Sequence, residues 1–203
     1  MEMAAIGNAD ANPAVDSALG SQNASQSSYR VAGTLKVVNN TRWMLQLEKC
    51  YINYGKVEAI FDQVRPGQSA VMKVHKTSYL ATGSSGTLAW TVVNENKSIV
   101  VMWSLPFNHD FSHNVLAVGI RSNNGNNENN GNTSNTFREM YSENEQSYFR
   151  RKEFYSVIDP VEHMDNRVKV RGRMGNAHKT DIIIDVHAIN PADQFGYVQD
   201  GLM

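Results

Sequence analysis

The alternation of apolar and polar positions predicts a chain built mainly from β-strands. From Gly86 to Val93 apolar side chains, among them Trp90, recur at period two, the spacing of one face of a strand. Asn94-Glu95-Asn96 follows as a turn, because asparagine tolerates left-handed backbone angles. The next strand, Ser98 to Leu105, is apolar at consecutive positions, so both of its faces must be covered. We therefore expect it in the middle of a β-sandwich or barrel, with Pro106 ending it.

Further strands are expected on both sides of this pair. They cover Val31–Val38, Arg42–Ile52, Val57–Phe61, Ser69–Val74, Val115–Ile120, Arg167–Met174 and Thr180–Ile189. Asn39-Asn40 joins the first two of these strands, and the last two are expected to pair across Gly175-Asn176 as a closing hairpin. Short strands with turns at regular intervals are typical of an all-β sandwich.

One helix is expected, over Thr136–Ser147. Thr136 and Glu139 have the spacing of a capping box, in which both side chains satisfy amides at the helix start. The apolar stripe of this helix is Phe137, Met140 and Tyr141. The preceding segment, Arg121–Asn135, is rich in asparagine and glycine and is expected to be a long mobile loop.

The expected organisation is a flexible segment over residues 1–30, a sandwich over residues 31–190 and a loose tail over residues 191–203. Within the first segment, Pro13–Gly20 has the signals for two helical turns, but its apolar face is small. Its composition favours a disordered leader. Cys50 is the only cysteine, so no disulfide forms within the chain, and we expect it buried at a strand end.

Charge and composition exclude several functional classes. The formal net charge of −1 gives no overall attraction to nucleic acid or to an anionic membrane. No apolar run is long enough to span a bilayer as a helix. No signal peptide is visible, so either a mature form or a cytoplasmic protein is expected.

Enzymatic readings find little support in the sequence. His109 and His113 have a spacing that binds metal only on a helix, whereas Pro106 and the polar residues around them indicate a loop. No nucleophile elbow, phosphate-binding loop or paired carboxylate arrangement is visible. We expect no catalytic residues, no metal and no cofactor.

Several short motifs resemble the actinoporins, the pore-forming cytolysins of sea anemones and their relatives. The resemblance spans roughly Thr34 to Ile189 and rests on the ATG-x-x-G-x-LA opening from Ala81 to Ala89, Ser104-Leu105-Pro106-Phe107 before an aromatic loop, Met140-Tyr141 and the closing strand from Asp181 to Ile189. It implies an actinoporin-like all-β sandwich with one or two short flanking helices.

The resemblance also implies a phosphocholine site, in which rings hold the quaternary ammonium and hydroxyls meet the phosphate. The implied lipid-headgroup-binding set is Tyr54, Ser85, Ser104, Pro106, Phe107, Phe111, Ser112 and Tyr141. Within it Ser104, Pro106 and Tyr141 match the family pattern, and Phe111 keeps an aromatic ring where the family has tryptophan. The sequence departs from the pattern at Tyr54, Ser85, Ser112, Val115, Leu116, Glu145 and Gln146. We therefore expect weak binding to choline lipids or a preference for another headgroup, and the alternative is that these rings only plug the sandwich end.

The function implied is that of a secreted, pore-forming cytolysin. It would recognise lipid headgroups, associate with itself on the membrane and insert its N-terminal segment as a cation-permeable pore. One alternative is a non-lytic lipid- or glycan-binding module on the same fold, resembling the fungal fruit-body lectins. Another is a non-lytic cytosolic relative.

A basic strand face offers a second candidate surface. Arg167, Lys169, Arg171 and Arg173 recur at period two and would point to one side. Such a basic patch would fit an anionic headgroup or a sulfated glycan. The alternative is a solvated face balanced by Asp159, Glu162 and Asp165.

Overall fold

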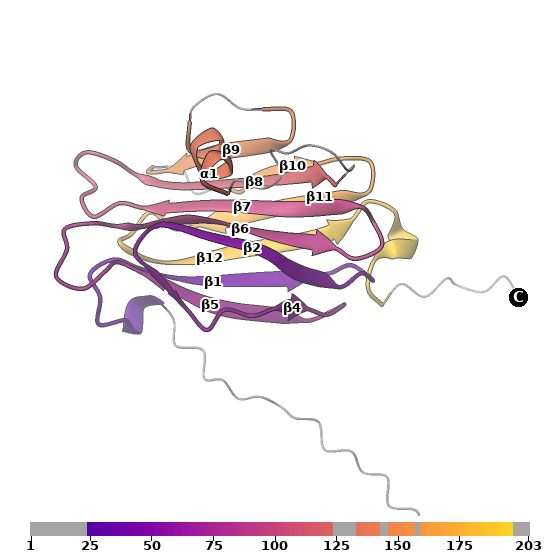
Figure 1. Ribbon diagram of the computed structural model, residues 1–203, viewed down its shortest axis with the longest axis horizontal. Helices are drawn as coiled ribbons and strands as arrows, with labels where there is room; N and C mark the ends of the chain where they lie inside the picture. Colours follow the sequence, from indigo (N-terminus) through magenta and orange to yellow (C-terminus); the bar gives the residue numbers. More distant parts are fainter. Residues whose placement is uncertain (1–23, 124–132, 143–145, 157–158, 197–203) are drawn as a thin grey trace, which may run out of the picture.

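The computed structural model describes residues 24–123, 133–142, 146–156 and 159–196. Two six-stranded sheets pack face to face, which confirms the expected all-β sandwich (Figure 1). The first sheet has the order β10-β11-β12-β1-β5-β3, and the second has the order β4-β2-β6-β7-β8-β9. The strands are β1 (Ala32–Asn39), β2 (Leu45–Tyr54), β3 (Lys56–Glu58), β4 (Gln63–Val64), β5 (Ser69–His75), β6 (Ser84–Val92), β7 (Lys97–Leu105), β8 (Asn114–Ser122), β9 (Phe149–Phe154), β10 (Val161–Met164), β11 (Val168–Met174) and β12 (Lys179–Ala188).

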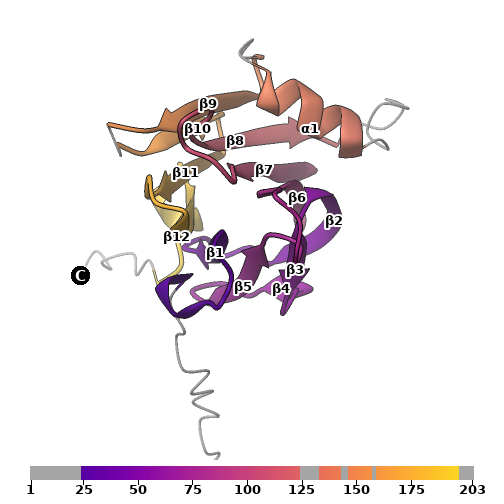
Figure 2. The same cartoon turned by 90° about the vertical axis from the view of Figure 1, so that its left-hand side faces the viewer.

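Strand β7 is covered on both faces, as its apolar run predicts. One face packs into the core between the sheets, and the other packs under the helix α1 (Thr133–Tyr141). The residues facing the core are Ile99, Val101 and Trp103, and those facing the helix are Val100 and Met102. Figure 2 shows α1 lying on the outside of the second sheet.

The turn before β7 has the chemistry that its asparagines predict. Asn94 and Asn96 have φ of 72° and 47°, in the left-handed region that asparagine tolerates better than most residues. The closing hairpin is also confirmed, because β11 and β12 pair antiparallel across Gly175-Asn176.

Strands β1 and β2 are neighbours in sequence but belong to different sheets. Asn39 makes this crossing possible, because its fully buried side chain donates to the carbonyl oxygens of Trp43 at 2.7 Å and Val64 at 3.0 Å. It also accepts from the amide of Thr41 at 3.0 Å. Strand β1 instead pairs parallel with β12, a long-range contact that local alternation does not encode.

The expected capping box is wrong. Helix α1 begins at Thr133, so Thr136 lies inside it, and residues 124–132 are outside the described part of the chain. Instead, Thr136 and Glu139 both accept hydrogen bonds from Arg121, at 2.8 Å and 3.1 Å. The apolar stripe is confirmed in part: Phe137 and Met140 are buried, whereas Tyr141 is exposed.

Other expectations need correction at the ends of the sandwich. Cys50 is exposed rather than buried, because β4 covers only Leu45 and Gln46 of β2 and leaves the rest of that edge open. The expected tail begins with a 3-10 helix, Pro191–Asp193, and Asp193 is buried, with an ion pair to Arg42 at 2.7 Å. Likewise a 3-10 helix, Ala24–Gln26, precedes β1 inside the segment expected to be flexible. The Pro13–Gly20 segment lies outside the described residues.

In the part of the chain that the structure describes, no helix is both long and apolar enough to cross a membrane.

Candidate functional site

One end of the sandwich collects the loops of both sheets. Ala32, at the start of β1, pairs with His75 at the end of β5 and with Lys179 at the start of β12. Ser84, at the start of β6, pairs with Leu105 at the end of β7. Loops 76–83 and 106–113 therefore lie at this end together with the segment before β1. It is the left-hand end in Figure 1 and faces the viewer in Figure 2. We call it the aromatic end.

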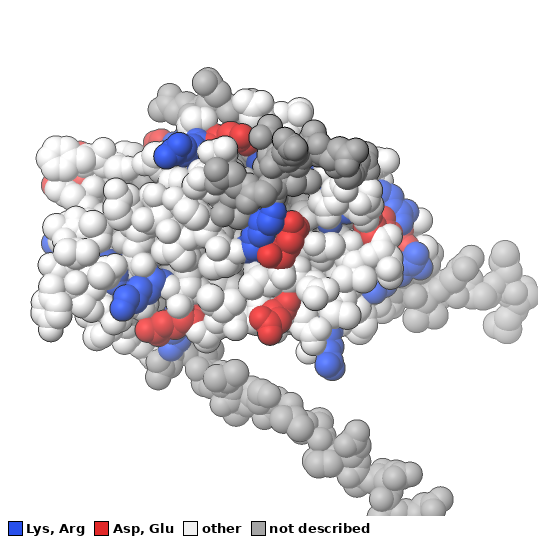
Figure 3. All heavy atoms as spheres, viewed as in Figure 1, with Lys and Arg blue, Asp and Glu red and all other residues white. Residues whose placement is uncertain are grey.

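Large apolar side chains project into solvent here. Tyr79 is completely exposed and Phe111 is 89% exposed. Leu80 is also exposed, as are Tyr54 at the end of β2 and Tyr155 just after β9. In Figure 3 this end carries few charged side chains on the face in view, whereas the opposite end is crowded with them. Exposed apolar side chains clustered in this way mark an interaction surface.

Tyr79 is held outward by an unusual backbone conformation. Its φ of 62° lies in the left-handed region, which non-glycine residues rarely adopt. Such a conformation costs free energy and persists only where the surroundings impose it. Tyr79 is therefore presented from a tight turn between β5 and β6, as Asn94 and Asn96 are between β6 and β7.

Hydrogen bonds between loops hold the aromatic end together. Asn114 is fully buried and its amide donates to the carbonyl oxygens of Gly175 and Ala177, both at 2.9 Å. Asn176 donates in turn to the carbonyl oxygen of Tyr155 at 2.6 Å. The exposed rings therefore stand on a scaffold that joins the two sheets, and no local sequence motif marks Asn114 for this role.

Three of the expected site residues lie side by side on the second sheet. Tyr54 pairs with Ser85, and Ser85 pairs with Ser104 on the next strand. Met102 faces the cluster under α1, so Ser104, two residues further, points to the same outer side. Ser85 Oγ accepts from Asn53 at 3.2 Å, whereas no described residue hydrogen-bonds the hydroxyl of Ser104. Ser104 is itself buried, with 8% of the residue exposed, so its hydroxyl lacks a described partner and is largely covered.

Tyr141 is linked to this row by a chain of contacts. Its ring stacks on Phe137 with centroids 5.5 Å apart, and Phe137 lies 6.0 Å from the ring of Tyr51. The hydroxyl of Tyr51 lies 3.5 Å from Asn53, the residue that donates to Ser85. Helix α1 therefore places Tyr141 on the same outer face as the serines.

The remaining expected residues divide between the surface and the interior. Phe111 is exposed, so it does not plug the sandwich end. Phe107 packs against the core between the sheets, as the plug alternative requires. Pro106 and Ser112 are half-buried in the same loop. The plug alternative therefore fits Phe107 and not Phe111, and lipid binding by Phe111 stays a prediction.

The histidines of this end pack against other rings. His109 stacks on His178 with centroids 3.8 Å apart, and His113 stacks on Tyr155 at 4.2 Å. Burial, with a smaller contribution from the charge of His178, lowers the pKa of His109. Within the described ranges no group of three His, Cys, Asp or Glu side chains is placed to hold a metal ion.

Neighbouring acids offset much of the charge of the expected basic patch. Lys169 and Arg171 share Glu162, at 2.7 Å and 3.2 Å, and Arg173 pairs with Asp185 at 3.0 Å. Val168 and Val170 point inward between these charges, as the strand pattern predicts.

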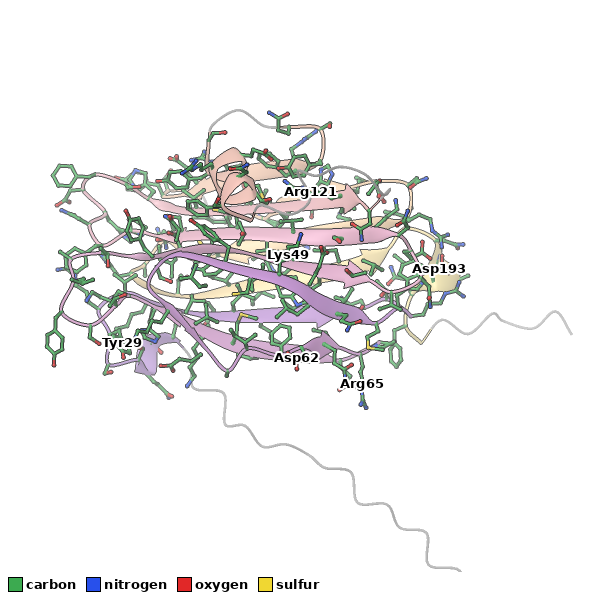
Figure 4. The ribbon with its side chains drawn as sticks, viewed as in Figure 1. Tyr29, Lys49, Asp62, Arg65, Arg121 and Asp193 are labelled. Atoms are coloured by element: carbon green, nitrogen blue, oxygen red, sulfur yellow. The ribbon has the colours of Figure 1, made fainter. Side chains whose placement is uncertain are left out.

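Arg167 precedes β11 and belongs to a separate cluster. It pairs with Glu95 at 2.6 Å and with Asp193 at 3.2 Å, and its hydrogen bond lowers the pKa of Glu95. Figure 4 places Asp193 at the end of the molecule opposite to Tyr29, so this cluster lies far from the aromatic end. These pairings favour the alternative of a solvated, internally balanced face.

Sequence reasoning missed several residues of the aromatic end. The sequence could have indicated Tyr79 and Leu80. Two adjacent apolar residues in a turn between strands are not expected to reach the core, so they indicate an exposed apolar surface. Tyr155 follows β9, a strand that the alternation did not reveal. The neighbours of Phe107, which are Arg30 and Lys76, come from distant parts of the chain and carry no local signal.

Comparison with known proteins places the chain in a class. No family model matches it. It is 35% identical to Tereporin-Ca1 of Terebra anilis over 158 residues, which is 75% of this chain and 82% of that protein. Echotoxin-2 of Monoplex parthenopeus is 29% identical, over 84% of this chain and 62% of its own length, so the chain spans less than two thirds of echotoxin.

The fold is also similar to that of a solved structure. The crystal structure of the lipid binding protein Nakanori superposes with a TM-score of 0.62 at 20% identity, covering 77% of this chain and 70% of that one. This likeness concerns the fold alone. The identity to tereporin shows that the chain belongs to the actinoporin-like family of pore-forming proteins, which are toxins and lipid-binding proteins and not enzymes.

Proposed function

We propose that this protein binds lipid bilayers through its aromatic end and forms pores in them. The observation that carries the proposal is the exposure of Tyr79, Leu80 and Phe111 on two loops at one end of a rigid sandwich. Aromatic side chains favour the boundary between water and hydrocarbon, because they present an apolar body with little conformational entropy to lose. When these side chains move from water into the headgroup region, their apolar surface is buried and the free energy of membrane binding becomes more favourable.

Headgroup recognition is assigned to the outer face beside these loops. The hydroxyl of Ser104 would meet the phosphate, and the exposed rings of Tyr54 and Tyr141 would attract a choline ammonium. The support is the register that aligns Tyr54, Ser85 and Ser104, together with the contacts that lead from Ser85 to Tyr141.

Pore formation rests on the family. Relatives carry the names tereporin, echotoxin and conoporin, which denote porins and toxins. By this proposal the protein is secreted, associates with further copies of itself on a target membrane, and inserts its N-terminal segment to form a cation-permeable pore.

A non-lytic lipid- or glycan-binding module is the second candidate, and contacts before β1 favour it. Tyr29 stacks on His75 at 3.9 Å, Lys179 donates to the carbonyl oxygen of Ser27 at 2.7 Å, and the amide of Ala24 donates to Asp181 at 3.4 Å. These contacts tie the end of the N-terminal segment to the sandwich. A protein that keeps them at the membrane would bind without inserting.

Dye release from vesicles of phosphatidylcholine, sphingomyelin and cholesterol separates the two candidates. The full chain is compared with a chain that begins at Ala24, where the described structure starts. Pore formation predicts that both chains float with the vesicles and that only the full chain releases dye. Binding by both chains without leakage from either would select the non-lytic module.

A further inference from the structure

Lys76 is a buried cation without a counter-ion. Only 8% of the residue is exposed, and its ammonium donates to the carbonyl oxygen of Thr77 at 2.8 Å. It pairs with none of the described acids, although an ammonium has three donors to satisfy. Lysine is almost never buried to this extent unless it is paired, because desolvating a charge is costly. An unpaired lysine at this position calls for a partner from outside the chain.

A second cation lies at the same ring. The ammonium of Lys76 is 5.8 Å from the centroid of Phe107, and the guanidinium of Arg30 is 4.5 Å from it. Arg30 is exposed and, like Lys76, pairs with none of the described acids. The backbone amide of Lys76 donates to the carbonyl oxygen of Val31 at 3.1 Å, so the backbone segments that carry the two cations lie side by side.

No described carboxylate forms an ion pair with either of these cations. His109 and His178 stack beside Phe107, and His178 is hydrogen-bonded to its carbonyl oxygen at 3.1 Å. The nearest described carboxylates on these elements have other roles. Glu58 pairs with His75 at 3.0 Å, and Asp181 accepts from the amide of Ala24. Asp110 is exposed in the loop and forms no ion pair within the described residues.

The contrast with β11 is informative. Every cation of the expected basic patch has a carboxylate within 3.2 Å, so that patch offers little net attraction. Arg30 and Lys76 have no carboxylate partner among the described residues, and they stand among the rings that would meet the membrane. If the aromatic end faces the membrane, the positive charges of Arg30 and Lys76 lie next to the bilayer surface and attract anionic headgroups.

From this geometry we infer a binding site for the phosphate of an anionic phospholipid, formed by Arg30 and Lys76 beside Phe107. Guanidinium and ammonium groups both form short, charge-assisted hydrogen bonds to phosphate oxygens. This site is separate from the headgroup site proposed at Tyr54, Ser85 and Ser104. Phe107 packs toward the core between the sheets, whereas Ser104 faces the outer side of the second sheet. This inference rests on the proposed membrane-binding function and adds a second lipid class to it.

Vesicle flotation tests the site with two compositions, phosphatidylcholine alone and phosphatidylcholine with phosphatidylserine. The variants are Arg30→Gln and Lys76→Met. Lys36→Gln, which removes one exposed charge from the middle of β1, is the matched control. For each variant we expect binding to the phosphatidylserine vesicles to weaken about fivefold, the ratio given by ~1 kcal/mol per basic residue at an acidic surface. Binding to phosphatidylcholine alone should be unchanged, and the control should bind as the wild type does.

The melting temperature of Lys76→Met shows whether a loss of binding comes from a loss of stability. Methionine has a similar length and no charge to desolvate, so Lys76→Met should melt at the same temperature or higher. A lower melting temperature with equal losses on both vesicle types would show that Lys76 is structural and would overturn the inference.

Two further outcomes are distinct. Wild-type protein that floats equally with both compositions, and variants that match it, would refute the anionic site while leaving membrane binding intact. Wild-type protein that floats with neither composition, nor with sphingomyelin and cholesterol, would refute membrane binding and the site with it. Inorganic phosphate is expected to change the melting temperature little. A large increase that Lys76→Met abolishes would identify a soluble phosphate ligand and overturn the assignment to a bilayer lipid.

Discussion

Ser85 and Ser104 stand directly opposite each other on β6 and β7, yet only Ser85 has a hydrogen-bond partner among the described residues. We therefore expect the Ser85 side chain to contribute to stability and the Ser104 side chain to contribute to headgroup binding. Ser85→Ala removes the acceptor of the Asn53 amide and should lower the free energy of unfolding by ~1 kcal/mol. Ser104→Ala should leave stability within about 0.5 kcal/mol of wild type, because it breaks no bond within the described structure.

The headgroup assignment predicts the opposite order for binding. Ser104→Ala should weaken flotation with choline-lipid vesicles more than Ser85→Ala does, after both are corrected for stability. Chemical denaturation and flotation of the two variants provide the comparison. Equal binding by Ser104→Ala and wild type would remove the outer face from the account.

The two phenylalanines of loop 106–113 should respond differently to truncation. Phe111 is 89% exposed, so Phe111→Ala should keep the melting temperature and lose vesicle binding. Phe107 packs on the core and carries Arg30 on its ring, so Phe107→Ala should lower the free energy of unfolding by about 2 kcal/mol. A stability loss at Phe111 would mean that its ring packs inside the protein.

Arg121 should be the residue that fastens α1 to the sheet. Its guanidinium donates to Thr136 and Glu139 and lies 4.3 Å from the centroid of Tyr148. Burial and the Glu139 hydrogen bond raise the pKa of Tyr148 to about 12, so the phenol stays neutral here. Arg121→Met should cost about 2 kcal/mol in denaturant unfolding, the range for hydrogen bonds to charged groups. Arg138→Met, on the exposed side of α1, is the control and should be nearly neutral.

The stacked histidines predict a decline of stability in mild acid. The fold lowers the pKa of His109, so the unfolded chain binds its proton first, near pH 6.5. The stabilising contribution is therefore complete above about pH 6.5 and is lost as the pH falls from there through the lower folded pKa. Melting temperatures measured from neutral to mildly acidic pH should fall in this range, and His109→Gln should reduce the slope. A flat profile for the wild type would contradict the burial of His109.

Glu95 acts in a separate and more acidic range. Its hydrogen bond with Arg167 lowers its pKa, so its contribution is present above the unfolded value of about 4.3 and is lost only below it. Glu95→Gln should therefore leave the slope near pH 6 unchanged, which makes it a control for His109→Gln.

The architecture was predictable from the sequence because strand alternation is a local signal. Residues close together in the sequence determine three of its features: the apolar run of β7, the asparagine turn before it and the β11–β12 hairpin. The parallel pairing of β1 with β12 was not predictable, since it joins residues from the two ends of the domain. The start of α1 was misplaced because Thr136 and Glu139 imitate a capping box while serving Arg121.

The candidate site was predictable only where the family motifs reach. Ser104 lies near the end of a recognisable strand that Pro106 and Phe111 follow, and the structure brings Ser104 into line with Tyr54 and Ser85. Charges on a strand could be counted from the sequence, but their partners on β10 and β12 could not, so the basic patch looked stronger than it is. The unpaired Lys76 was invisible because burial and the absence of a counter-ion are properties of the folded chain.

Flotation of a double variant, Tyr79→Ser with Phe111→Ser, tests the membrane-binding end most directly. The control is Ile189→Ser, which removes an exposed apolar side chain just past β12 at the opposite end. We predict that the control floats with sphingomyelin–cholesterol vesicles as the wild type does, while the double variant stays in solution at an unchanged melting temperature. A folded double variant that floats as well as the wild type would contradict the assignment of the aromatic end to the bilayer.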